Sequence, residues 1–136
     1  MVDTSVWIEF FRKGEEKASI LLDSLLEQDR AALCGIVELE LLRGVRPGER
    51  KRLGSILDAL HHFDTTREDF IKAGERLNEL RQKGIAIPST DAIIAMICVR
   101  NNLPIFTLDS HFDHLPEVKR FDISTTDRMN REEDLQ

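Results

Sequence analysis

The chain of 136 residues lacks the features that mark membrane, secreted and nucleotide-binding proteins. It has no run of about 18 apolar residues, so no membrane-spanning helix is expected. No signal-peptide pattern precedes the first structured-looking segment, which favours a cytoplasmic location by default. Neither a G-x-G-x-x-G pattern nor a P-loop is present, which argues against a nucleotide cofactor.

Cysteine is scarce, and its placement does not suit a metal site. The only two cysteines, Cys34 and Cys98, lie far apart in apolar stretches. A free cysteine in such surroundings behaves as a small hydrophobic residue. We therefore expect two buried, reduced thiols and no zinc site.

Positive charge is also in deficit. The chain has 19 Lys and Arg residues but 25 Asp and Glu residues, which gives a net charge of −6 and a pI of about 5.2. A passive nucleic-acid-binding module normally carries a basic surface, so the acidity argues against that class. It does not exclude a site built from carboxylates, because bound cations reverse the local field.

Helix and strand patterns alternate along the chain, which predicts one parallel α/β domain. The domain is expected to cover residues 1–124, and a polar tail over 125–136 is expected to be disordered. Expected strands are 1–3, 31–35, 61–63, 103–108 and 121–123. Expected helices are a first one capped by Thr4 or Ser5 and ending near Gly14, then 16–28, 36–43, 47–59 and 66–83, and a last one capped by Ser89 or Thr90.

Four acidic residues stand where an α/β fold forms its crevice. Asp3 ends the first strand and Asp109 follows a later one, whereas Asp91 and Glu40 lie in helices. Ligands bind beyond the carboxyl ends of the strands in such sheets, so all four side chains can face one point. Clustered carboxylates repel each other unless a hard cation such as Mg²⁺ or Mn²⁺ joins them. A cation of this kind can activate water and orient a phosphodiester.

Each acid taken alone also has an ordinary structural explanation. Asp3 suits a helix N-cap, and Asp91 would interact favourably with a helix dipole. Asp109 suits an Asx turn, and Glu40 can pair with Arg43 one turn away. The metal-site hypothesis therefore depends on all four occurring together.

Four segments of the sequence resemble the motifs of PIN-domain toxins of the VapC type. They come in the family's order and span most of the chain, at residues 1–8, 40–44, 87–95 and 103–109 with Phe112 behind the last. The resemblance implies a three-layer α/β/α sandwich whose central parallel sheet has about four or five strands. It also implies a Mg²⁺- or Mn²⁺-dependent endoribonuclease with an RNA substrate, a cognate antitoxin and a homodimeric state.

The resemblance also implies roles for individual residues. The expected catalytic carboxylates are Asp3, Glu40, Asp91 and Asp109. Asp3 and Asp91 would be direct metal ligands, and Asp109 would bind a second metal or a bridging water. Glu40 would act through water, as an orienting group or proton acceptor. The expected supporting hydroxyls are those of Thr4, Ser5 and Thr107.

The expected RNA contacts are Arg43, Arg46 and His111. The two arginines begin a basic stretch over residues 43–52 that can hold phosphate, although a solvated loop is the alternative. His111 stands where many family members carry another acid. It is interpreted either as a ligand or phosphate contact, or as a surface histidine near the mouth of the site.

Two other functions stay open at this point. One is a PIN nuclease that processes or degrades RNA without an antitoxin, and the other is a non-catalytic PIN-like binding module. Phosphotransfer enzymes of the haloacid-dehalogenase type are disfavoured, because Ser5 occupies the position of their second aspartate.

Overall fold

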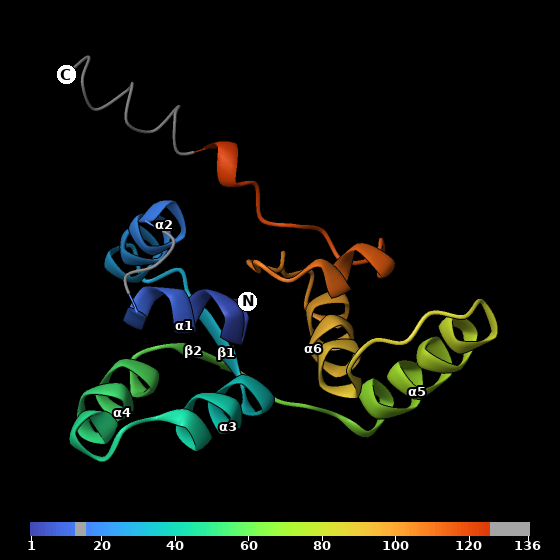
Figure 1. Cartoon of the computed structure of the whole chain (residues 1–136), viewed down its shortest axis with the longest axis horizontal. Helices are drawn as coiled ribbons and strands as arrows, with labels where there is room; N and C mark the ends of the chain where they lie inside the picture. Colours follow the sequence, from blue (N-terminus) through green and yellow to red (C-terminus); the bar gives the residue numbers. More distant parts are fainter. Residues whose placement is uncertain (13–15, 126–136) are drawn as a thin grey trace.

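A parallel sheet lies at the centre of the computed structural model, which describes residues 1–12 and 16–125 (Figure 1). Strands β1 (Ala32–Cys34) and β2 (His61–Phe63) pair in parallel. The start of the chain lies along the other edge of β1, where the Val2 amide donates to the Ala32 carbonyl at 3.3 Å. The first residues of the chain are therefore part of the sheet, as predicted.

Isolated bridges extend the sheet on the far side of Val2. Val2 bridges Phe106 and Ile105 bridges Arg120, both in parallel. The extended segments therefore follow the spatial order 61–63, 32–34, 1–3, 105–106 and 119–121. The chain builds outward from residues 1–3 in one direction and then in the other. A topological switch point thus lies between residues 1–3 and 105–106, where open α/β sheets form their binding crevice.

Helices surround this sheet and give the expected layered α/β/α architecture. In Figure 1, α1 and α2 lie above β1 and β2, α3 and α4 lie below, and α5 and α6 form a packed pair at the other end. The helices are α1 (Thr4–Arg12), α2 (Glu16–Glu27), α3 (Gly35–Gly44), α4 (Arg50–Asp58), α5 (Arg67–Gln82) and α6 (Ser89–Arg100). Short 3₁₀ turns are η1 (Pro47–Glu49), η2 (Ser110–His114) and η3 (Ile123–Thr125).

The ends of α5 illustrate how local sequence sets these boundaries. Thr66 and Asp69 form a reciprocal capping box, in which each side chain accepts from the other residue's backbone amide. At the other end Gly84 has a φ of 76°, a left-handed conformation that glycine adopts without steric cost. Both the start and the stop of this helix were predicted from the sequence.

Several predicted boundaries are wrong. The predicted helix over 47–59 is divided into η1 and α4. Ser89 and Thr90 do not cap α6, because Pro88 is the N-cap and Ser89 is already helical. The predicted strands 103–108 and 121–123 are reduced to single bridges at Ile105, Phe106 and Arg120, and residues 123–125 form η3 instead. The chain leaves the sheet early here because the residues after Phe106 turn toward side-chain partners described below.

Both cysteines lie in the hydrophobic core. Cys34 and Cys98 are free and buried, as predicted. Burial raises the pKa of Cys34, and it raises the pKa of Cys98 to about 12. The thiolate is the reactive form of cysteine. Burial therefore protects both thiols in two ways, because reagents cannot reach them and their raised pKa values keep them protonated.

We therefore expect neither thiol to react with a disulfide reagent in the native protein at pH 8. Both should react within minutes after unfolding in urea. A colorimetric thiol assay with and without denaturant measures the difference, and rapid labelling of a native thiol would contradict the structure.

Two sequence-based expectations lie partly or wholly outside the described residues. These are the end of the first helix near Gly14 and most of the polar tail, since residues 13–15 and 126–136 are not described. The domain boundary at residue 124 stays a prediction. Within residues 1–12 and 16–125, no helix is long and apolar enough to cross a membrane.

Candidate active site

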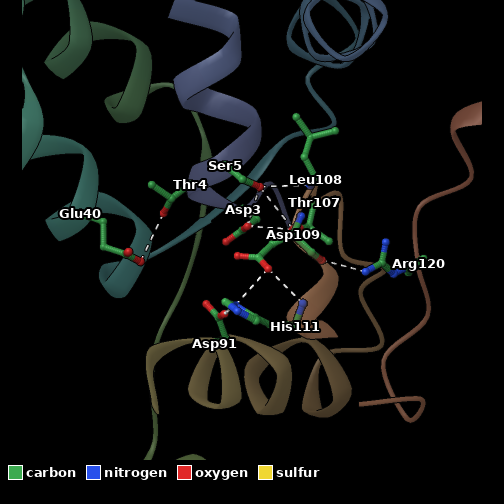
Figure 2. A network of polar contacts seen from close by, with 10 residues as sticks. All are labelled: Asp3, Thr4, Ser5, Glu40, Asp91, Thr107, Leu108, Asp109, His111 and Arg120. Atoms are coloured by element: carbon green, nitrogen blue, oxygen red, sulfur yellow. Dashed lines mark hydrogen bonds and ion pairs between the residues drawn. The ribbon is translucent and has the colours of Figure 1, made fainter. Parts of the chain in front are cut away.

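Asp3 lies at the switch point, buried and held by two hydroxyl groups. The hydroxyls of Ser5 and Thr107 donate to Asp3 Oδ2 at 2.7 and 2.8 Å. The same Thr107 hydroxyl accepts the amide of Asp109 at 3.0 Å, and the Ser5 hydroxyl accepts the amide of Leu108 at 3.1 Å (Figure 2). These bonds fasten the residues after the sheet segment 105–106 to the end of the first one. They use only one oxygen of the Asp3 carboxylate.

Asp91, Asp109 and His111 form a second group beside Asp3 (Figure 2). His111 Nδ1 lies 2.9 Å from Asp91 Oδ2 and 2.9 Å from Asp109 Oδ1. Asp91 comes from the first turn of α6, whereas the other two residues open η2. One ligand atom from each of the three lies within 4.8 Å of the others. The site is thus assembled from three distant parts of the sequence.

The electrostatics of Asp91 reflect this crowding. Burial raises the pKa of Asp91, and the charges of Asp3 and Asp109 raise it further, to about 6. The hydrogen bond from His111 and the charge on its ring act in the opposite direction without cancelling the rise. A carboxylate in this setting favours any arrangement that brings positive charge close to it.

Glu40 lies at the margin of the acidic group. Its Oε1 accepts from the Thr4 hydroxyl at 3.2 Å. Burial and the charge of Asp3 raise the pKa of Glu40, whereas Thr4 and Arg43 lower it. Glu40 also lines a groove of about 650 Å³ between α1, α3 and α4, together with Gly44 and Arg46. The Glu40 carboxylate therefore links the acidic group to an adjoining groove.

The residues present suit a divalent cation. Two carboxylates and an imidazole offer ligand atoms within 4.8 Å of each other, and a third carboxylate, Asp3, raises the pKa of Asp91 through its charge. Carboxylate oxygens suit Mg²⁺ and Mn²⁺, and an imidazole nitrogen suits transition-metal ions. Asp91, Asp109 and His111 are the residues best placed to hold the ion, with Asp3 next to them.

The structure brings most of the predicted site together. Asp3, Asp91 and Asp109 lie together, and the hydroxyls of Ser5 and Thr107 donate to Asp3. Glu40 and Thr4 stand at the margin of this group. Of the expected RNA contacts, Arg43 and Arg46 are exposed, and Arg46 lines the groove.

Sequence reasoning missed two features of the site. The first is the position of His111 between two carboxylates, for which the sequence left open a ligand or phosphate-contacting role and a surface position near the mouth of the site. Arg120 donates to the Asp109 carbonyl at 2.8 Å and pairs with Asp113 at 2.9 Å, so it holds the loop that carries the site. The sequence carries no motif that marks this arginine.

Together the fold and the site define a parallel α/β domain with a cluster of acidic side chains at its switch point. The profile of the PIN domain matches residues 1–118, and the chain belongs to this family.

Named relatives and solved structures agree with this assignment. Ribonuclease VapC11 of Mycobacterium tuberculosis is 28% identical over 125 residues, which cover 87% of this chain and 92% of that protein. Ribonuclease VapC21 of the same species is 30% identical over 103 residues, covering 73% and 75%. The structure of VapBC2 from Rickettsia felis, bound to a promoter DNA fragment, matches with a TM-score of 0.71 and 25% identity over 89% of this chain and 96% of that one.

Proposed function

We propose that this chain is a metal-dependent endoribonuclease and the toxin half of a toxin–antitoxin pair. The observation that carries the proposal is the convergence of Asp3, Asp91 and Asp109 at the switch point of a PIN domain. The similarity to ribonucleases VapC11 and VapC21 supports RNA cleavage as the reaction. The structural match to VapBC2 of Rickettsia felis supports the toxin–antitoxin assignment.

In this proposal the chain's own residues bind and orient the reactants. Asp91 and Asp109 would hold Mg²⁺ or Mn²⁺, and Asp3 would complete the site from the adjacent sheet segment. A bound ion of this kind supplies charge neutralisation and a more acidic bound water. The hydroxyls of Ser5 and Thr107 keep Asp3 in one orientation, which preorganises the site before substrate arrives.

Glu40 is proposed to act on water at the edge of this group. Burial and the Asp3 charge raise its pKa, which makes the carboxylate a better proton acceptor than an exposed glutamate. The hydroxyl of Thr4 orients its carboxylate. The groove beside Glu40 carries Arg46 and Arg52, which can neutralise the phosphates of an RNA strand that leads into the site.

The antitoxin is proposed to cover the same groove, which also carries the apolar side chains of Ile8 and Phe11. A partner segment with apolar and acidic side chains would match both features. A homodimer and a cytoplasmic location both stay predictions.

Chelation provides the direct test of the metal requirement. We expect EDTA to reduce cleavage of a single-stranded RNA by more than about 100-fold. The chelator removes the cation that would neutralise charge and make a bound water more acidic. Adding excess Mg²⁺ or Mn²⁺ should restore the activity. The measurement is the rate of loss of a fluorescently labelled RNA, and cleavage that survives EDTA would exclude the proposed mechanism.

A further inference from the structure

The imidazole of His111 occupies an unusual place for a solvent-accessible histidine. Its Nδ1 lies 2.9 Å from an oxygen of Asp91 and 2.9 Å from an oxygen of Asp109 (Figure 2). Its backbone amide also donates to Asp109 Oδ1 at 2.9 Å, so the turn that opens η2 holds the backbone of His111 next to Asp109. The side chain is 41% exposed, which leaves the cluster accessible from solvent.

One ring nitrogen does not satisfy two carboxylates well by hydrogen bonding. Nδ1 carries at most one proton, and that proton can point directly at only one of the two oxygens. By contrast, a cation can bind all three atoms at once. Ligands on adjacent corners of an octahedron with bonds of about 2.1 Å lie about 3.0 Å apart. The two separations at Nδ1 are close to that spacing.

We infer that His111 Nδ1 is a direct ligand of the cation and gives this site a preference for Mn²⁺ over Mg²⁺. The inference rests on the metal site of the proposed function and makes it more specific. Mg²⁺ is a hard ion that takes oxygen ligands by strong preference, whereas Mn²⁺ also binds carboxylates but, as a transition-metal ion, accepts a nitrogen ligand more readily. An acid at position 111 would give an all-oxygen site, so the identity of this one residue sets the choice of ion.

Titration calorimetry with MnCl₂ and MgCl₂ tests the preference on the full-length protein. In the parent we expect Mn²⁺ to bind at least about 10-fold more tightly than Mg²⁺. His111→Asp should retain Mg²⁺ binding and lower this ratio by about 10-fold, and His111→Ala should weaken Mn²⁺ binding by about 10-fold or more. His114→Ala is the matched control, because this exposed histidine lies outside the cluster, and it should leave both affinities unchanged.

A spectroscopic measurement on the parent protein makes the test independent of any variant's folding. Pulsed electron paramagnetic resonance of bound Mn²⁺ should show the coupling of a directly bound ¹⁴N nucleus, and His111→Asp should remove it. Absence of nitrogen coupling in the parent would overturn the inference, and so would an ion preference that does not change in His111→Asp.

RNA cleavage by the same preparations separates this inference from the proposed function. Metal-dependent cleavage without nitrogen coupling would overturn the role of His111 alone. Nitrogen coupling in a protein that cuts no RNA would support the ligand assignment and overturn the nuclease proposal.

Discussion

Replacing Asp91 by Asn is expected to reduce RNA cleavage by about 100-fold or more while leaving the fold intact. The substitution keeps the shape of the side chain but removes the charge that holds a divalent cation. Loss of outer-sphere partners of a metal already costs 10- to 100-fold in affinity or activity, so loss of a direct ligand should cost at least the upper value. The measurement is single-turnover cleavage of labelled RNA at saturating Mg²⁺ or Mn²⁺.

The stability of the same variant distinguishes a functional role from a structural one. Burial and neighbouring acids raise the pKa of Asp91 to about 6, so its charged form is disfavoured in the folded protein without a cation. The neutral Asn should therefore give an unfolding midpoint equal to or above that of the metal-free parent. Asp23→Asn, an exposed acid on α2, is the matched control and should leave both cleavage and stability unchanged. If Asp91→Asn cut RNA at the parent rate, the assignment of the site would be wrong.

The convergence of Asp3 and Asp109 could be predicted because it follows from topology. Each acid comes at or just after the end of an extended apolar segment, and the carboxyl ends of parallel strands meet at the same edge of a sheet. The alternation of apolar segments with amphipathic helices indicates that the strands are parallel. The sequence alone therefore predicts that these carboxylates lie close together.

The positions of Glu40 and His111 could not be predicted in the same way. Glu40 lies on α3, and the rotation of that helix about its axis depends on how Val37 and Leu41 pack into the core. The position of the His111 ring depends on a turn in which the Asp109 carboxylate accepts the His111 amide. In this turn the ring lies against Asp91. Sequence spacing fixes which residues are neighbours along the chain but not the direction of a side chain in a short turn. Asp109 thus adopts the Asx turn considered as its alternative and joins the acidic group as well.

Replacing Asp69 by Ala is expected to have the largest effect on stability, a loss of about 3 kcal/mol. The carboxylate is 1% exposed and accepts three bonds from Arg100, two of them through Oδ2, at 2.9 to 3.2 Å. The carboxylate also accepts the Thr66 amide at 2.9 Å as part of the capping box. The variant removes the half of the capping box that binds the Thr66 amide, worth about 1 kcal/mol, and the charged hydrogen bonds from Arg100, worth about 1.5 to 3 kcal/mol. It also loosens the contact between α5 and α6, and α6 carries Asp91.

Urea denaturation followed by the fluorescence of Trp7, the only tryptophan, measures this loss. Glu68→Ala is the matched control on the same turn of α5. Glu68 makes an exposed ion pair with Lys72 at 3.1 Å, and a pair of this kind contributes less than about 0.5 kcal/mol. A loss below about 1 kcal/mol for Asp69→Ala would show that the bonds of Asp69 contribute little to the free energy of unfolding.

The pH dependence of the difference in unfolding free energy between the parent and Asp69→Ala tests whether the charge of Asp69 causes the loss of stability. Burial alone would raise the pKa of Asp69, but the hydrogen bonds from Arg100 and Thr66 outweigh it and lower the pKa below the ordinary value of 3.8. A carboxyl group with a lowered pKa in the folded state stabilises the protein above its unfolded pKa, and this contribution is lost as the pH falls through the folded pKa. The difference between parent and Asp69→Ala should therefore be constant near neutral pH and shrink below about pH 4. A difference that did not change with pH would mean that Asp69 stabilises the protein by packing rather than by its charge.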